Sequence, residues 1–314
     1  MKRSLLALVV FAASSWSQAK EPVSPVRARM QTFVKDKVIS GSVTTIATKD
    51  KMLSLETVGY ADLKTKEVMR PDHLFWIASM TKPMASVCVL QLQEEGKLSI
   101  EDPVEKHLPE FKGQWMVEKR EGGKLILKRP AHAITIRDLL THTSGLANTS
   151  TPRTESTLGE LVMSYSKTPL NFKPGSKWSY SNAGINTLGR IVEVVSGVPF
   201  AKFLQERVLD PCGMKDTTFW PTPAQAKRVA KSYRPDKNGE LQQVEVRFLA
   251  GGISNRKRTP YPAGGLYSTA GDVTLFYQMM LNGGIANGKR VLKKETAALM
   301  TRTQTGDIET GFVE

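Results

Sequence analysis

The chain has few of the residues that metal sites and disulfide frameworks require. Its 314 residues include two cysteines and four histidines, and no two of the histidines have the spacing of a metal site. Cys88 lies in an apolar segment and Cys212 in a Pro-Cys-Gly turn, so we interpret both as small buried thiols. A disulfide between them remains the alternative, since an exported chain could oxidise them. We expect neither a metal nor a cofactor.

Two familiar catalytic motifs are also absent. No serine lies in a G-x-S-x-G turn, which excludes a Ser-His-Asp hydrolase of that kind. Gly264 and Gly265 lack the strand, spacing and lysine of a phosphate-binding loop, and we interpret them as a turn lining a substrate cleft. His142 lies in a Leu-Thr-His-Thr-Ser-Gly turn beside a helix end, where a histidine is typically a structural hydrogen-bonding residue.

Long hydrophobic runs are missing as well. The apolar run from Leu5 to Ala13 is much shorter than the roughly 20 residues that cross a membrane. Lys2 and Arg3 precede it, and small residues at 17 and 19 suit a signal peptidase, so we expect a signal peptide over residues 1–19. The remaining chain is then exported, either to a periplasm or out of the cell.

Acidic residues are outnumbered by basic ones, 30 to 44, which gives a formal charge of +14 and, without Lys2 and Arg3 of the leader, 14 − 2 = +12. The longest basic run is only Arg256 to Arg258 and no nucleic-acid motif is present, so the charge favours solubility or anionic envelope polymers over nucleic acid. With 40% hydrophobic and 24% charged residues, the chain is globular and has material for one domain or two packed subdomains.

The order of apolar patterns predicts strands first and helices afterwards. A helix over 24–34 precedes an antiparallel hairpin, 39–48 with 52–60, and a second hairpin, 114–119 with 124–129, follows later. Further helices are expected over 134–140, 158–165, 185–195 and 200–204. Thr269 and Asp272 resemble a capping box that opens a last helix, with four residues facing inward: Val273, Phe276, Tyr277 and Met280.

The segment from Phe75 to Gly96 is the centre of the predicted fold. It predicts a helix that is apolar nearly all round, begins close to Ser79 and ends at Gly96. Ser79 and Lys82 are three residues apart, so on a helix their side chains can meet. A buried lysine has a lowered pKa, and its neutral amine can take the proton of a serine hydroxyl.

A second motif, Lys177-Trp-Ser-Tyr-Ser-Asn182, stands just before another predicted helix. A tyrosine hydroxyl beside a lysine ammonium can act as a proton relay, and an asparagine can both donate and accept hydrogen bonds to a substrate. Taken singly, Tyr180 is more often a packed core tyrosine. The two motifs together are more specific than either alone.

The run Ser79-Met-Thr-Lys82, the run 139–146 (Leu-Leu-Thr-His-Thr-Ser-Gly-Leu) and Tyr180-Ser-Asn182 closely resemble the serine β-lactamase and penicillin-binding family, in its class C and related esterase branch. The resemblance covers essentially the whole mature chain. It implies that Ser79 is acylated, that Lys82 and Tyr180 share the base and acid roles, and that Asn182 touches the substrate.

The resemblance also implies an α+β fold in which an antiparallel sheet flanked by helices packs beside a mainly helical lobe, with the site between them. On this basis the hydrolase domain covers 20–314, with its sheet part at about 20–75 and 270–314 and its helical lobe at about 76–269. The family's third motif, Lys-Thr-Gly or His-x-Gly on a late strand, is not found after Met300, where the nearest triplet is Gln304-Thr-Gly306.

We therefore expect a chain truncated at its C-terminus, without the strands that complete the sheet. Half of the oxyanion hole would be lost with them, and one such donor is worth roughly a hundred- to a thousandfold in turnover. We expect this chain to turn over slowly or not at all and its full-length parent to be an active hydrolase.

Three activities fit the same acyl-enzyme: hydrolysis of small esters, which we favour, hydrolysis of β-lactams, and D-alanyl-D-alanine carboxypeptidase action on peptidoglycan. The expected partner is accordingly a small ester or amide, with peptidoglycan as a candidate, and neither nucleic acid nor a stable membrane span is expected. An interpretation of another class is a non-catalytic envelope binder or a β-lactam sensor that is acylated but never turned over.

Overall fold

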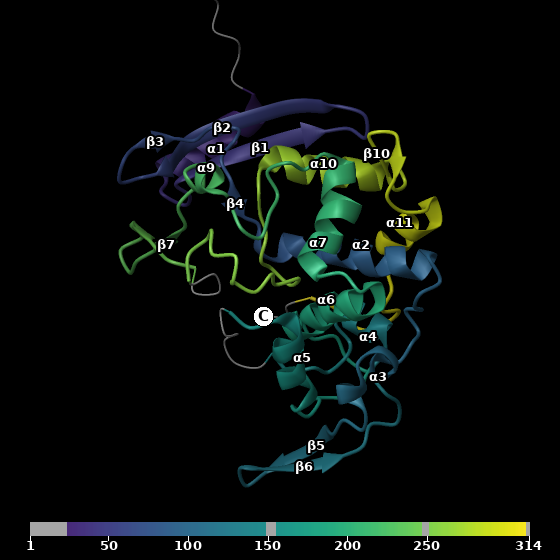
Figure 1. The fold of residues 1–314 in the computed structure, drawn as a ribbon. Helices are drawn as coiled ribbons and strands as arrows, with labels where there is room; N and C mark the ends of the chain where they lie inside the picture. Colours follow the sequence, from purple (N-terminus) through teal and green to yellow (C-terminus); the bar gives the residue numbers. More distant parts are fainter. Residues whose placement is uncertain (1–23, 149–154, 247–250, 312–314) are drawn as a thin grey trace, which may run out of the picture.

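The computed structural model describes residues 24–148, 155–246 and 251–311 (Figure 1). The predicted signal peptide, residues 1–19, lies outside these ranges. Within them, no helix combines the length and the apolar character that crossing a bilayer requires.

The first half of the described chain begins with a helix and a hairpin and then enters the long helix α2. Its elements are α1 (Pro25–Lys35), β1 (Gly41–Ala47), β2 (Met52–Asp62), β3 (Glu67–Val68), β4 (Phe75–Trp76), the 3₁₀ turn η1 (Ala78–Met80), α2 (Thr81–Glu94), α3 (Val104–His107), η2 (Pro109–Phe111), β5 (Met116–Glu121), β6 (Lys124–Lys128) and α4 (Ile136–Leu140).

The second half is mainly helical, with short strands between the helices. Its elements are α5 (Leu158–Ser166), α6 (Asn182–Ser196), α7 (Phe200–Leu204), the π-helical turn η3 (Gln205–Leu209), α8 (Asp210–Cys212), α9 (Pro223–Ala226), β7 (Tyr233–Pro235), β8 (Leu241–Gln243), β9 (Tyr267–Ser268), α10 (Ala270–Leu281), β10 (Ile285–Ala286), β11 (Lys289–Arg290) and α11 (Lys294–Met300).

The strands β1, β2 and β3 form an antiparallel sheet with a helix on each face (Figure 1). Ser24 at the start of α1 donates to Glu56 on β2 at 2.7 Å, whereas Thr45 on β1 bonds Thr274 of α10 at 2.8 Å. Thr45 is paired with Leu55, so it faces away from the side on which Glu56 lies. Therefore α1 and α10 cover opposite faces of this sheet.

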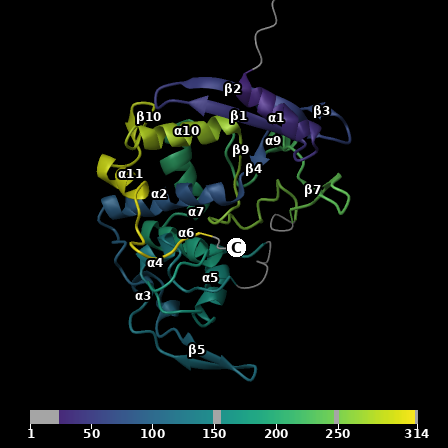
Figure 2. The ribbon, with the colours of Figure 1, turned by 180° about the vertical axis from the view of Figure 1, so that it is seen from behind.

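Helix α2 runs through the middle of the molecule, between the sheet part and the helices α4, α5 and α6 (Figures 1 and 2). Ten of its residues are buried, from Thr81 to Leu92, which confirms the prediction of a helix that is buried nearly all round. It begins at Thr81, two residues after Ser79 and directly after the 3₁₀ turn η1, which agrees with the predicted start close to Ser79. Gly96 follows its end with a φ of 68°, the left-handed conformation expected of a closing glycine.

The two predicted hairpins are confirmed, since β1 pairs with β2 and β5 pairs with β6, both antiparallel. Four other strand pairs were not predicted: β2 with β3, β4 with β9, β7 with β8 and β10 with β11. β7 and β8 form a short hairpin of polar, largely exposed residues, which carries no alternating apolar pattern. β4 pairs with β9, so that residues 75–76 and 267–268 lie side by side although they are far apart in the sequence.

Helix α10 differs from the prediction in its cap and in the side chains that face inward. Thr269 caps it by accepting from the Asp272 N–H at 3.1 Å, but the Asp272 carboxylate accepts from Asp216 N–H and the Thr217 hydroxyl, so only half of a capping box forms. Tyr277, predicted to face inward, is 44% exposed. One further position of that helix face, Met280, is only partly buried.

Both cysteines are buried free thiols, which confirms the preferred interpretation over a disulfide. Burial raises the pKa of each, that of Cys212 to about 12, so neither forms a reactive thiolate near neutral pH.

Candidate active site

The backbone makes an unusual turn just before α2. Ala78 has a φ of 46°, in the left-handed region that residues with a Cβ rarely adopt. The buried Thr81 hydroxyl donates to the carbonyl of Ala78 at 2.7 Å and accepts from the N–H of Leu266 at 3.3 Å. These bonds tie the turn to the chain before β9. The turn leaves the Ser79 side chain exposed while Lys82, three residues on, is buried.

Lys82 is at the centre of the polar contacts. Its Nζ donates to Ser79 Oγ at 3.1 Å, to Asn182 Oδ1 at 2.8 Å and to the carbonyl of Ala263 at 2.5 Å. All three acceptors are uncharged, so none offsets the burial of an ammonium group. Burial accordingly lowers the pKa of Lys82 to about 8. Near neutral pH a usable fraction of this amine is therefore unprotonated.

The second motif meets the first at Ser79. The Tyr180 hydroxyl donates to Ser79 Oγ at 2.5 Å, and Lys82 Nζ lies 4.6 Å from the centroid of the Tyr180 ring. Asn182 reaches the same cluster through its bond to Lys82. The structure thus brings together all four site residues that the sequence predicts.

The start of α6 carries Tyr180 and Asn182, and two side chains cap it. Ser181 accepts from the N–H of Gly184 at 3.0 Å, as an N-cap residue does. Asn148 accepts from the N–H groups of Asn182 and Ala183 at 2.7 and 3.3 Å. Asn148 was not found by sequence reasoning, because no local pattern links it to residues more than thirty positions away.

His142 makes the structural hydrogen bond expected of it. Its Nδ1 accepts from the N–H of Ser181 at 3.2 Å, and its ring lies 4.8 Å from that of Tyr180 and 5.9 Å from that of Trp178. Burial, together with the nearby Lys82 charge, lowers the pKa of His142 to about 4. The ring is therefore neutral at physiological pH, and the bond from Ser181 leaves its proton on Nε2.

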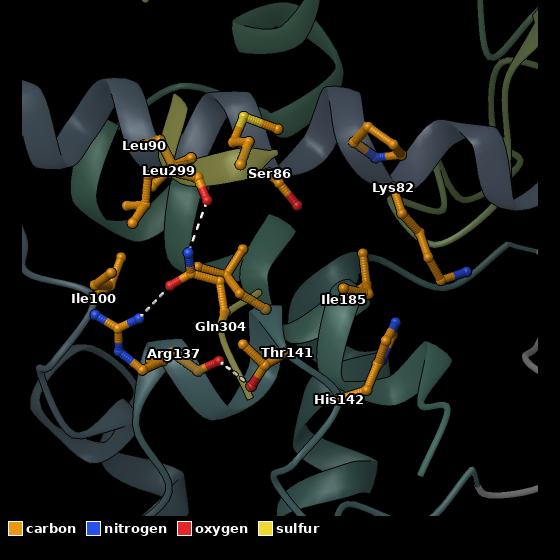
Figure 3. A pocket seen from close by; sticks show the side chains of 13 residues that line it. Lys82, Ser86, Leu90, Ile100, Arg137, Thr141, His142, Ile185, Leu299 and Gln304 are labelled. Carbon is orange, nitrogen blue, oxygen red and sulfur yellow. Dashed lines mark hydrogen bonds between the residues drawn. The ribbon is translucent and has the colours of Figure 1, made fainter. Parts of the chain in front are cut away.

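A cavity of about 290 Å³ lies beside Lys82, between α2, α4 and the chain from the end of α11 onward (Figure 3). Its walls are mainly apolar, and Lys82 and His142 close one end. Gln304, from the triplet nearest to the missing third motif, also lines the cavity and accepts from Arg137 at 2.9 Å. The triplet that contains Gln304 does not lie on a strand, since residues 301–311 contain none.

No cluster of three or more potential ligands for a metal ion occurs in residues 24–148, 155–246 and 251–311.

The Gly264 carbonyl accepts from Trp76 Nε1 at 2.6 Å, so this glycine-rich turn packs beside β4 and η1. Its position agrees with a turn beside the candidate site.

Comparison with known proteins decides the family. The family model described as Beta-lactamase matches residues 26–312. The chain belongs to the Beta-lactamase family. This family consists of serine hydrolases, and the α+β fold with an antiparallel sheet flanked by helices is confirmed by solved structures of it. EstCE1, a hydrolase with promiscuous acyltransferase activity, superposes with a TM-score of 0.73 at 26% identity, over 88% of this chain and 75% of its own.

Relatives within the Beta-lactamase family have several activities. Protein Rv1367c of Mycobacterium tuberculosis is 34% identical over 86% of this chain and 69% of its own length. Esterase EstB of Burkholderia gladioli is 30% identical over 76% and 65%. A putative D-alanyl-D-alanine carboxypeptidase of Escherichia coli is 28% identical over 99% and 80%. The chain is thus a serine hydrolase of this family, with both esterases and carboxypeptidases among its relatives.

Proposed function

We propose that this chain hydrolyses small carboxylic esters through an acyl-enzyme on Ser79. The observation that carries the proposal is the geometry at Ser79 Oγ, which lies within hydrogen-bond distance of both Lys82 Nζ and the Tyr180 hydroxyl. A serine hydroxyl needs such a neighbour because it is a weak nucleophile until a base takes its proton.

Lys82 is the base in this proposal because its pKa of about 8 leaves about a tenth of the amines neutral at pH 7. As Ser79 Oγ bonds to the ester carbonyl carbon, its proton passes to the neutral amine. Tyr180 then gives its phenolic proton to the leaving alkoxide oxygen and regains one from Lys82. The products of this step are an alcohol and an acyl-Ser79 ester, which water hydrolyses by the same transfers in reverse.

The charge on the carbonyl oxygen needs stabilisation while Ser79 attacks. We propose that the partial positive charge of the backbone at the start of α2 supplies part of it, because Ser79 lies in the turn just before this helix. Asn182 is placed to orient the substrate, because its amide contacts Lys82 and lies beside Ser79 in the same cluster.

The choice of esters over other acyl donors is supported by the relatives. EstB is an esterase by name and EstCE1 is a hydrolase, and both cover most of this chain. β-Lactams and D-alanyl-D-alanine peptides are the alternatives, since a putative carboxypeptidase is also similar. We further propose that residues 20–314 form the hydrolase domain, with its sheet part at about 20–75 and 270–314, and that residues 1–19 direct its export.

The test compares p-nitrophenyl butyrate, a chromogenic cephalosporin and a D-alanyl-D-alanine tripeptide as substrates for the purified chain and for Ser79→Ala. Hydrolysis of the ester predicts nitrophenolate release that is absent from the variant, with a burst of up to one nitrophenolate per chain where deacylation is the slower step. A burst with the cephalosporin alone would overturn the ester assignment. A stable acyl adduct without any release over hours would indicate a sensor instead of an enzyme.

A further inference from the structure

We propose that Asn148 is a positioning residue that holds Tyr180 and Asn182 against Ser79 and Lys82. Asn148 is an exposed residue directly after the turn that carries His142. Its Nδ2 donates to the carbonyl of Tyr180 at 2.8 Å, while its Oδ1 accepts from the N–H of Asn182 at 2.7 Å. One side chain therefore binds the backbone on both sides of Ser181.

The partners of Asn148 fix the orientation of its amide. A carbonyl can only accept and an N–H can only donate, so Nδ2 must face Tyr180 and Oδ1 must face the start of α6. Oδ1 also accepts from the N–H of Ala183 at 3.3 Å. The N–H of Gly184 donates to Ser181, so side chains accept from each of the first three N–H groups of α6.

These bonds fix the two side chains that the proposed mechanism uses. Tyr180 and Asn182 leave the backbone on either side of Ser181 and reach Ser79 Oγ at 2.5 Å and Lys82 Nζ at 2.8 Å. Ser181 has extended backbone angles, φ −130° and ψ 110°, and no helix of its own to hold it. His142 and Leu146 hold Ser181 itself, through its N–H and its hydroxyl, whereas Asn148 binds the backbone of the two flanking residues. Losing Asn148 therefore loosens the residues that set both distances.

The role of a helix cap does not account for all of the hydrogen bonds of Asn148. Capping requires an acceptor for the N–H groups of α6, which Oδ1 supplies. The bond from Nδ2 to the Tyr180 carbonyl adds nothing to the cap, but it holds the residue that donates to Ser79. The two roles can therefore be separated by a substitution that keeps the acceptor and removes the donor.

Asn148→Asp is that substitution. Its carboxylate still accepts from the N–H groups of Asn182 and Ala183, and a negative charge at a helix N-terminus stabilises the helix. It cannot donate to the Tyr180 carbonyl, and its charge repels that oxygen. We expect an unfolding midpoint at least as high as that of the unsubstituted chain, together with acylation slowed by about tenfold to a hundredfold, as for a misplaced catalytic group.

The experiment measures the rate constant for labelling by a fluorescent fluorophosphonate, with the unfolding midpoint, for the unsubstituted chain, Asn148→Asp and Asn148→Ala. Asn238→Ala is the matched control, an exposed asparagine in the turn between β7 and β8. The inference rests on the proposed role of Ser79, which the unsubstituted chain and Ser79→Ala test first. Asn148→Asp labelled at the unsubstituted rate would overturn the inference. The inference would also be overturned if Asn148→Ala lowered both the unfolding midpoint and the labelling rate while Asn148→Asp restored both, because Asn148 would then act only as a helix cap.

A crystal structure of Asn148→Asp tests the inference even if Ser79 is not acylated. The inference predicts that the Tyr180 hydroxyl moves beyond hydrogen-bond distance of Ser79 Oγ. If Tyr180 keeps its contact in a folded variant, Asn148 does not position it.

Discussion

Two helix starts meet at the candidate site, and they are held in different ways. The start of α2 has no side-chain cap, and its turn is fixed by a left-handed Ala78 and by the buried Thr81 hydroxyl. The start of α6 is held by side chains, Ser181 from its own N-cap and Asn148 from a distant loop. The start of α2 is therefore set by burial, whereas the start of α6 is set by side-chain hydrogen bonds, the buried one of Ser181 and those of the exposed Asn148.

This difference indicates how each end should respond to substitution. Groups on α2 lie in a packed environment, so changing them alters the chemistry while the fold is kept. Groups around the start of α6 set the position of Tyr180 and Asn182, so changing them alters the distances from these two side chains to Ser79 and Lys82. We expect substitutions at the start of α2 to lower the acylation rate most, and substitutions at the start of α6 to lower it by smaller, graded amounts.

The largest effect is expected for Lys82→Met, which keeps the length of the side chain and removes the amine. Loss of a general base costs about a hundred- to ten-thousandfold, and we expect acylation by the fluorophosphonate to fall by about a thousandfold. The unfolding midpoint should not fall, because an apolar side chain avoids the cost of burying a charge. Labelling at more than about a tenth of the unsubstituted rate would show that Lys82 is not the base.

Tyr180→Phe tests the α6 end directly. It removes only the hydroxyl that donates to Ser79 Oγ, so we expect an acylation rate about a hundredfold lower, with the fold unchanged. Tyr277→Phe, at an exposed tyrosine of α10, is the matched control and should label at the unsubstituted rate. Equal rates for Tyr180→Phe and the control would remove Tyr180 from the proton relay.

The pH dependence separates Lys82 from His142. Because the amine must be neutral to accept a proton, the acylation rate should rise about tenfold for each pH unit below the pKa of Lys82, about 8, and level off above it. His142, whose pKa is lowered to about 4, should add no step between pH 5.5 and 7. A rate that levels off at pH 7 would contradict Lys82 as the titrating base.

The smallest effect is expected for Ser181→Ala at the N-cap of α6. It removes the acceptor for the N–H of Gly184, which costs about 1 kcal/mol of unfolding free energy and lowers the midpoint by a few degrees. Asn148 still holds the two flanking residues, so acylation should fall only severalfold. A loss as large as that of Tyr180→Phe would mean that Ser181, and not Asn148, positions this end.

Much of the α2 end could be predicted from sequence because burial leaves a pattern. The apolar run after Lys82, the closing Gly96 and the three-residue spacing from Ser79 all predict the observed helix. The hairpin of β1 and β2 was predicted for the same reason. The 3₁₀ turn before Thr81 was not predicted, because apolar periodicity does not distinguish a 3₁₀ turn from the first turn of an α-helix.

Less of the start of α6 could be predicted from the sequence. Tyr180 and Asn182 were found through the family motif, but Asn148 is one asparagine in a loop, and its role depends on a fold that places it beside residues more than thirty positions away. The strands β7 and β8 were missed because they are short and polar. Tyr277 was assigned to the wrong face because it lies about 100° round the helix from the buried Phe276, on the exposed side of α10.

The central claim is that Ser79 is the acylated residue. The measurement that tests it most directly is labelling of the purified chain by a fluorescent fluorophosphonate, beside Ser79→Ala, followed by mass spectrometry of the labelled peptide. One label needs a single attack of the serine oxygen on phosphorus, with loss of fluoride and no turnover, so slow hydrolysis does not obscure it. The account predicts one label per chain on Ser79 and none in the variant. An unlabelled chain, or equal labelling of Ser79→Ala, would contradict it.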